Sequence, residues 1–236
     1  MKLNNPIYII SAIPNESSKF KNLFQSGEHT LMDLLAHPGS FRYAGWDLET
    51  LDSPKIVAGE YLEVRNGDRK TIQLYEDGTL IFKMPVGPTF LGWGRREENF
   101  EEAPRLNPVA LIEVSANFVY FYKKLLPFFE IKPQEIIFKI EFHNMKLSND
   151  KFIYLNPSPV NSIGWSLDDE HSPAPDENME KEIIINSDLL NTKPGVVSYK
   201  VIERIFLWFG IPTNKIPYIK SDGGESTVNI ELISKK

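Results

Sequence analysis

The chain contains no cysteine, and this absence removes several kinds of chemistry from consideration. Disulfide bonds, thiol catalysis and cysteine-ligated zinc sites all need a residue that the sequence does not have. The absence of cysteine fits a reducing compartment, and we expect a cytoplasmic protein. The opening residues, Met1 to Asn5, are polar, and the apolar run that follows ends at Pro14, so we expect no signal peptide.

Long hydrophobic runs and an excess of positive charge are also missing. The longest apolar stretch, residues 108–131, is interrupted by charged side chains and by Pro127, so we expect no membrane-spanning helix. The net charge of −6 comes entirely from residues 167–182, which hold seven acids and one base, and the rest of the chain is balanced. A free-standing nucleic-acid binder normally has a basic surplus, so we expect nucleic acid to be involved only indirectly.

The common catalytic and phosphate-binding motifs are missing as well. The glycine-rich residues 87–94 have neither the Lys-Ser/Thr ending of a P-loop nor the spacing of a dinucleotide site. No G-x-S-x-G elbow and no H-E-x-x-H pair occurs, and the four histidines are scattered. The densest acidic cluster, 168–171, lies in a segment that we interpret as a mobile loop. The sequence therefore predicts no catalytic residue, no metal site and no cofactor, and it favours a non-enzymatic protein.

Two turn-forming dipeptides are the most informative feature that is present. Asn66-Gly67 and Asp77-Gly78 stand between segments in which apolar and polar residues alternate. Such dipeptides readily take the positive φ angles of a type I′ turn, whose twist matches that of the flanking strands. We therefore predict a three-stranded antiparallel meander within residues 56–85, with strands at 56–65, 69–76 and 79–85.

Hydrophobic periodicity predicts the remaining elements. Residues 6–13 are apolar on both faces, which indicates a central strand. Further strands are expected at 134–143, 151–155, 182–186 and 227–233. Helices are expected as short pieces within 16–36 and as two long helices. The first covers about 108–126, with Asn107 as its N-cap and Pro108 at its first position, and the second covers about 196–209 and stops at Gly210.

These elements predict an α+β protein with a mainly antiparallel sheet packed against the two long helices. We expect residues 1–150 to form the core domain. Residues 151–236 are expected to be a C-terminal extension that packs on the same core and carries an acidic mobile loop at 167–182.

Aromatic residues in and beside the meander give the one candidate site. Trp46 and Trp93 each follow a glycine in a predicted loop, and Gln73 and Tyr75 lie on the middle strand of the meander. Large aromatic side chains in loops more often contact partners than those in strands do. We therefore predict that Trp46, Gln73, Tyr75 and Trp93 bind a protein partner or a small ligand.

Several segments, in this order, resemble a domain found in bacterial regulators. They are the strand from Ile7 to Pro14, the Gly45-Trp46 step, the stretch from Gln73 to Gly78, and the 108–126 helix leading into the 134–142 strand. Together they resemble the C-terminal domain that follows the Schlafen-like AlbA domain in proteins described as ATP-binding or helix-turn-helix regulators. The resemblance covers about residues 6–143. It implies an accessory role beside a nucleic-acid-binding partner, and it implies no catalytic residues.

Three functions follow from these patterns. The favoured one is a non-enzymatic sensing or protein-interaction module, accessory to a nucleic-acid-binding regulator or defence protein. The first alternative is a hydrolase or nuclease whose carboxylates converge only in the folded chain. The second is a domain that binds nucleic acid directly, which requires a basic groove and a salt-sensitive affinity.

Overall fold

The fold is described from a computed structural model, in which residues 5–41, 45–49, 52–67, 70–87, 90–92, 104–155, 172–222 and 224–234 are described. It is a mixed α+β protein with a large antiparallel sheet and two long helices, as the sequence predicts. The sheet has seven strands in the order β12-β9-β1-β6-β5-β4-β3, and each neighbouring pair is antiparallel. In sequence order its strands are β1 (Ile7–Pro14), β3 (Lys55–Val57), β4 (Tyr61–Asn66), β5 (Lys70–Tyr75), β6 (Leu80–Pro85), β9 (Glu135–His143) and β12 (Met179–Asn186).

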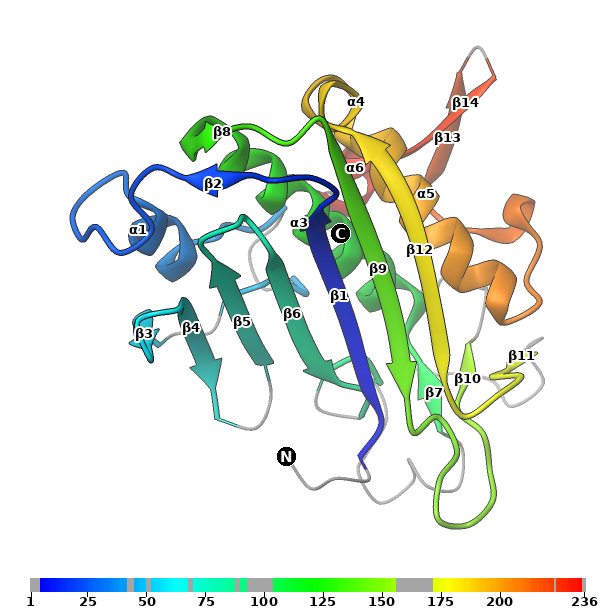
Figure 1. The fold of residues 1–236 in the computed structure, drawn as a ribbon. Coiled ribbons are helices and arrows are strands. Elements are labelled where there is room, and N and C mark those ends of the chain that lie inside the picture. Colours follow the sequence, from blue (N-terminus) through cyan, green and yellow to red (C-terminus); the bar gives the residue numbers. More distant parts are fainter. Residues whose placement is uncertain are drawn as a thin grey trace.

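The two long helices, α3 (Pro108–Leu125) and α5 (Pro194–Trp208), lie on the same face of this sheet, behind it in Figure 1. α3 is buried nearly all round, which fits its apolar sequence. Its N-cap is Asn107, whose Oδ1 accepts hydrogen bonds from the backbone N–H groups of Val109 and Ala110 at 3.0 and 3.4 Å. This cap and Pro108 in the first turn were both predicted, because they satisfy or remove donors that a helix start leaves unpaired.

Shorter elements surround this two-layer core. They are β2 (Lys19–Phe20), which pairs with β8 (Phe129–Ile131); α1 (Leu31–Ala36); the short sheet of β7 (Arg105–Leu106), β10 (Tyr154–Leu155) and β11 (Ser172–Pro173); the 3₁₀ turns Leu126–Phe128 and Thr213–Lys215; α4 (Ser187–Thr192); the hairpin β13 (Ile219–Asp222) and β14 (Glu225–Val228); and α6 (Ile230–Ser234).

The predicted first strand of the meander, 56–65, is instead two antiparallel strands, β3 and β4, joined by a tight turn in which the N–H of Glu60 donates to the carbonyl of Val57, so the meander has four strands.

Three further local predictions were wrong, because contacts distant in sequence override local preference. Residues 19–20, expected in a helix, form β2, where the N–H of Phe20 donates to the carbonyl of Glu76 at 2.9 Å. The last predicted strand, 227–233, ends at Val228, because Asn229 caps α6 through a hydrogen bond from the N–H of Leu232 to its Oδ1. Residues 179–182, expected in the acidic loop, are the first half of β12. Residues 156–171 lie outside the described part of the chain.

The turn between β5 and β6 is also different from the prediction. A type I′ turn needs positive φ at both central residues, and here Gly78 has a φ of +89° while Asp77 does not have positive φ. The N–H of Gly78 donates to the carbonyl of Tyr75, and the N–H of Tyr75 donates to the carbonyl of Thr79. The connection is therefore a three-residue loop that ends in a left-handed glycine, the second commonest way to join two antiparallel strands.

Two buried tyrosines bond across the core. The hydroxyl of Tyr8 lies 3.0 Å from Oγ of Ser115, which itself donates to the carbonyl of Leu111, so Tyr8 is the donor to Ser115. The hydroxyl of Tyr122 donates to the carbonyl of Gly78 at 3.1 Å. Burial raises the pKa of both phenols well above the ordinary value of about 10.

These two phenols predict a loss of stability in alkali. Above pH about 10 the unfolded chain ionises both tyrosines while the folded chain keeps them protonated, so the unfolded state binds fewer protons. The contribution of these two phenols to the free energy of unfolding should therefore be complete below pH about 10. Above that pH the free energy of unfolding should fall by about 1.4 kcal/mol per pH unit for each tyrosine. Urea unfolding at several alkaline pH values measures this slope. Tyr8→Phe should reduce the slope of the free energy of unfolding against pH by about one tyrosine's contribution. An unchanged slope in that variant would contradict the assignment of the alkaline loss to the buried phenols.

Candidate functional site

The seven-stranded sheet has an outer face, which points away from α3 and α5. No described helix or strand packs on it, and it faces the viewer in Figure 1. Along each strand alternate side chains point to this outer face. Because the strands are in register, these side chains form rows that cross the sheet between β12 and β3, and three rows hold most of them.

The first row is apolar and the other two are mixed. Row one holds Ile184, Ile137 and Ile13 on one half of the sheet, and Tyr75, Tyr61 and Val57 at the same end of the other half. Row two crosses all seven strands, in the order Glu182, Lys139, Ser11, Ile81, Gln73, Glu63 and Lys55. Row three crosses six strands, in the order Glu180, Glu141, Ile9, Lys83, Thr71 and Arg65.

The middle of this outer face is more apolar than a solvated sheet face usually is. An antiparallel sheet with one free face normally alternates between apolar residues inside and polar residues outside. The central strands β1 and β6 instead present Ile7, Ile9, Ile13 and Ile81 outward, each partly exposed. On the edge strand β12, Ile184 is 59% exposed. Apolar side chains gathered on one exposed face are typical of interaction surfaces.

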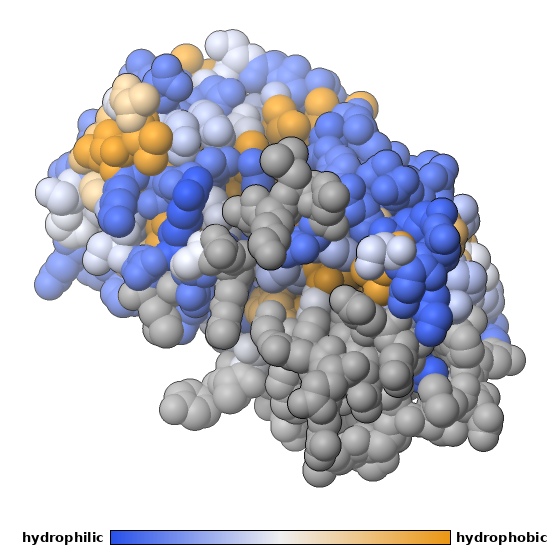
Figure 2. Space-filling view, turned by 90° about the horizontal axis from the view of Figure 1, so that it is seen from below, coloured by the Kyte–Doolittle hydropathy of each residue, from blue (hydrophilic) through white to orange (hydrophobic). Residues whose placement is uncertain are grey.

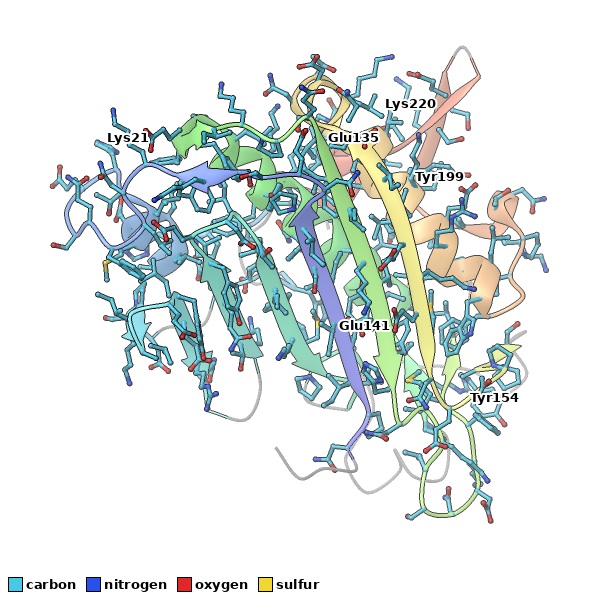
Figure 3. The ribbon with its side chains drawn as sticks, viewed as in Figure 1. Lys21, Glu135, Glu141, Tyr154, Tyr199 and Lys220 are labelled. Atoms are coloured by element: carbon cyan, nitrogen blue, oxygen red, sulfur yellow. The ribbon has the colours of Figure 1, made fainter. Side chains whose placement is uncertain are left out.

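Two polar clusters stand on either side of this apolar middle. On β9 and β12, Nζ of Lys139 lies 3.0 Å from Oε1 of Glu180 and 3.3 Å from Oε1 of Glu141. The pKa of Lys139 is raised, chiefly by its hydrogen bond to Glu180. Figure 3 labels Glu141 and Glu135, which both lie on β9.

The second cluster lies on the same outer face, in the half formed by β4 and β5, and the carboxylate of Glu63 is at its centre. It accepts from Nε of Arg65 at 2.9 Å and from Nε2 of Gln73 at 2.9 Å. Beside it the rings of Tyr61 and Tyr75 stack with centroids 4.8 Å apart. Partial burial, and then the nearby Tyr61 and Glu63, raise the pKa of the Tyr75 hydroxyl.

The three described residues of the predicted binding site do not share one face of the sheet. Gln73 and Tyr75 lie on the outer face, whereas Trp46 lies on the helix side of the sheet, where its backbone carbonyl accepts from Nδ2 of Asn117 on α3 at 3.0 Å. Its indole Nε1 donates to the carbonyl of Phe90 at 3.1 Å. Trp93 lies outside the described residues.

A largely buried ion pair holds the Trp46 segment in place. Nζ of Lys70, which points to the helix side of β5, lies 3.1 Å from both Oδ1 and the backbone carbonyl of Asp47. The same ammonium group stands 4.9 Å from the centre of the Phe90 ring. These contacts give Trp46 and its neighbours a structural role in closing one end of the core.

Comparison with other proteins gives no family. No protein-family model matches the chain, and no curated protein or solved structure is significantly similar to it. The resemblance to the Schlafen-like AlbA accessory domain is therefore a prediction that the comparisons do not test, and the function must be argued from the geometry of the molecule.

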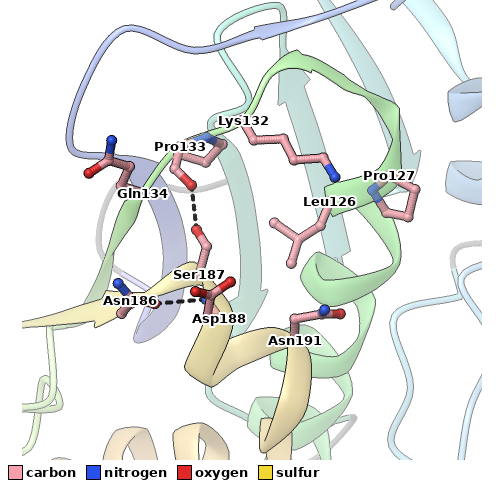
Figure 4. A pocket seen from close by; sticks show the side chains of 9 residues that line it. All are labelled: Leu126, Pro127, Lys132, Pro133, Gln134, Asn186, Ser187, Asp188 and Asn191. Carbon is pink, nitrogen blue, oxygen red and sulfur yellow. Dashed lines mark hydrogen bonds between the residues drawn. The ribbon is translucent and has the colours of Figure 1, made fainter.

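The outer face must be weighed against a surface pocket at one end of the sheet. This pocket has a volume of about 450 Å³ and lies between the β8–β9 connection and the start of α4 (Figure 4). Two of its polar groups are satisfied internally: Oγ of Ser187 donates to the carbonyl of Pro133, and Oδ1 of Asn186 accepts from the N–H of Asp188. Among the described residues, the charged side chains that line it are Lys132 and Asp188.

The described residues contain no group of three or more His, Asp or Glu side chains placed to share a metal ion. The same residues contain no helix with the length and apolar character required to cross a membrane.

Sequence reasoning missed the outward isoleucines as a site. The apolar residues on both faces of 6–13 were interpreted only as the sign of a central strand, and β1 does lie between β9 and β6. The informative signal was the combination of two apolar faces with too few helices to cover both. The two long helices pack on one face, which leaves the second apolar face of β1 open.

Proposed function

We propose that this protein is a non-enzymatic interaction module that binds a protein partner on the outer face of its seven-stranded sheet. The observation that supports this proposal is the apolar middle of that face, built by Ile7, Ile9 and Ile13 of β1 and Ile81 of β6, with no described element covering it. An apolar centre with a charged rim is the usual composition of a protein–protein interface.

The shape of the surface also favours a macromolecule over a small ligand. Small molecules bind in concave pockets that enclose most of their surface. The outer face is a broad sheet surface (Figure 1). Figure 2 shows another side of the molecule, seen from below, where patches of hydrophobic residues lie among hydrophilic ones. The resemblance to an accessory domain of nucleic-acid-binding regulators supports the same class of function, a cytoplasmic module that acts through a protein partner.

Site-specific photocrosslinking tests this proposal. A photoreactive amino acid at Ile9, on the outer face, should crosslink to a protein in cells that produce the chain. The matched control is Leu207, which is 45% exposed on α5, and should not give that product. The purified complex should then lose about tenfold in affinity with Ile9→Asn, because one buried apolar side chain at an interface centre contributes more than 1 kcal/mol. Equal crosslinking from both positions, or an unchanged affinity, would sink the proposal.

A further inference from the structure

The three rows of the outer face have a symmetry that identifies the partner. β6 is the fourth of the seven strands, so three strands lie on each side of it. A two-fold axis that runs along β6 and lies just above the face brings a second copy of the sheet onto the first. This rotation places β12 over β3, β9 over β4 and β1 over β5 of the other copy.

Row two is then its own chemical complement. Glu182 falls opposite Lys55 of the second copy, and Lys139 falls opposite Glu63. Ser11 falls opposite Gln73, and Ile81 meets Ile81 of the second copy at the axis. Every charged group in this row thus meets a group of opposite charge, and each charged contact occurs twice because of the symmetry.

Row one pairs apolar groups, and row three follows the charge rule except at Lys83 and at Glu180, which has no β3 residue opposite it. In row one the isoleucines of β1, β9 and β12 fall opposite the tyrosines and the valine of β5, β4 and β3, so that apolar groups meet apolar groups. In row three Glu141 falls opposite Arg65, and Ile9 falls opposite Thr71. Lys83, on the axis strand, is the one side chain in these rows that meets its own like charge.

The charges of the two halves agree with this arrangement as a whole. On β9 and β12 the outer face carries four acids and one lysine, and on β3 to β5 it carries two bases and one acid. The two-fold axis places the acidic half of each copy on the basic half of the other. The residues are Glu135, Glu141, Glu180, Glu182 and Lys139 on one half, and Lys55, Arg65 and Glu63 on the other.

The area is sufficient for a stable pair. Seven strands at about 4.8 Å spacing and about six residues long, at about 3.4 Å per residue, present a face of roughly 29 by 20 Å. Two such faces remove roughly 1,200 Å² from water, which reaches the lower end of specific protein–protein interfaces. Face-to-face packing of two antiparallel sheets with nearly aligned strands is a common arrangement.

We propose that the partner is a second copy of this chain, in a symmetric dimer formed by the outer faces of the two sheets. This inference rests on the proposed function, because it names the partner of the same surface. The pair belongs to the class in which one self-complementary patch serves both subunits. Because much of its complementarity is electrostatic and exposed at the rim, its affinity should decrease with added salt.

Charge exchange between Glu182 and Lys55 tests the dimer directly. Both side chains are exposed and lie on the two edge strands, so replacing them leaves the core intact. Glu182→Lys alone, or Lys55→Glu alone, sets like charges opposite each other at two symmetric contacts, and we expect each to weaken dimerisation about tenfold in analytical ultracentrifugation. The double variant should recover the original affinity. An equimolar mixture of the two single variants should also form a mixed dimer.

Lys200→Glu is the matched control, because Lys200 is an exposed lysine on α5 in the helix layer. It should dimerise like the original chain. Circular dichroism should show equal thermal stability for every variant, so that loss of folding is not mistaken for loss of pairing. A chain that stays monomeric at high micromolar concentration would overturn the inference, as would single variants that pair like the control, or a double variant that does not recover.

The outcomes also separate this inference from the proposed function. A monomeric chain that crosslinks from Ile9 to a different protein would overturn the symmetric dimer and keep the interaction module. A monomeric chain with no crosslink from Ile9 would overturn both.

Discussion

Gly78→Ala should destabilise the protein by about 3 kcal/mol, through strain and steric overlap acting together. Gly78 has a φ of +89°, in the region that side-chain-bearing residues seldom adopt. A Cβ atom at this position would overlap Cε1 and Cζ of the Phe129 ring and would lie 3.3 Å from Cγ of Pro14. The carbonyl of the same residue accepts the hydroxyl of the buried Tyr122, so the backbone cannot shift without losing that bond.

Gly59→Ala is the control that separates the two effects. Gly59 also has positive φ, at +75°, but a Cβ there meets nothing within 4 Å. The free energy of unfolding of this variant should therefore fall only by the cost of the backbone strain, about 1 kcal/mol. Urea denaturation followed by far-ultraviolet circular dichroism measures both changes. Equal losses in the two variants would show that the overlap with Phe129 is relieved at little cost.

Phe142→Ala should lower the free energy of unfolding by about 4 kcal/mol. The side chain of Phe142 is fully buried on the helix side of β9. Its ring stacks on Tyr8 at 4.7 Å and on Trp208 at 5.6 Å, and it meets Phe209 edge-on at 6.1 Å. It therefore joins the centre of the sheet to the end of α5, and truncation leaves a cavity between them.

His143→Ala is the neighbouring control for this truncation. His143 is the next residue of β9 and points to the outer face, where it is only partly buried. Its replacement should change the free energy of unfolding by less than about 0.5 kcal/mol. Guanidinium unfolding, followed by tryptophan fluorescence, compares the two variants. A small effect of Phe142→Ala would mean that α5 can close the gap, and that its docking depends on other contacts.

The sequence predicted the elements whose periodicity is strong and whose ends carry their own signals. α3 begins where Asn107 and Pro108 predicted it, and α5 ends before Gly210, which has the positive φ expected of a helix terminator. The errors occurred where the backbone finds distant partners. Nothing local to Phe20 announces that its N–H group bonds to Glu76, so a helix was expected where a strand forms.

The candidate surface could be predicted only in part, for a related reason. Alternation places Gln73 and Tyr75 on the polar face of their strand, and the structure finds them there. Strand order cannot be obtained from alternation, and without it the charges of β12 and β3 could not be compared. The complementarity of Glu182 and Lys55 depends on a register set by strands that lie far apart in the chain. Trp46 was assigned to a surface because its loop position is evident from the sequence, whereas its bond to Phe90 is not.

The position of β1 has a consequence for the order in which the protein folds. Ile10 pairs with Phe82 on one side and with Ile140 on the other, so β1 needs residues far along the chain for both of its neighbours. Topologies dominated by such distant pairings fold slowly. On the ribosome, β3 to β6 can assemble as a local unit and β1 can then pair with β6, but the other edge of β1 stays open until β9 is synthesised. This interval is when a chaperone would have most to protect.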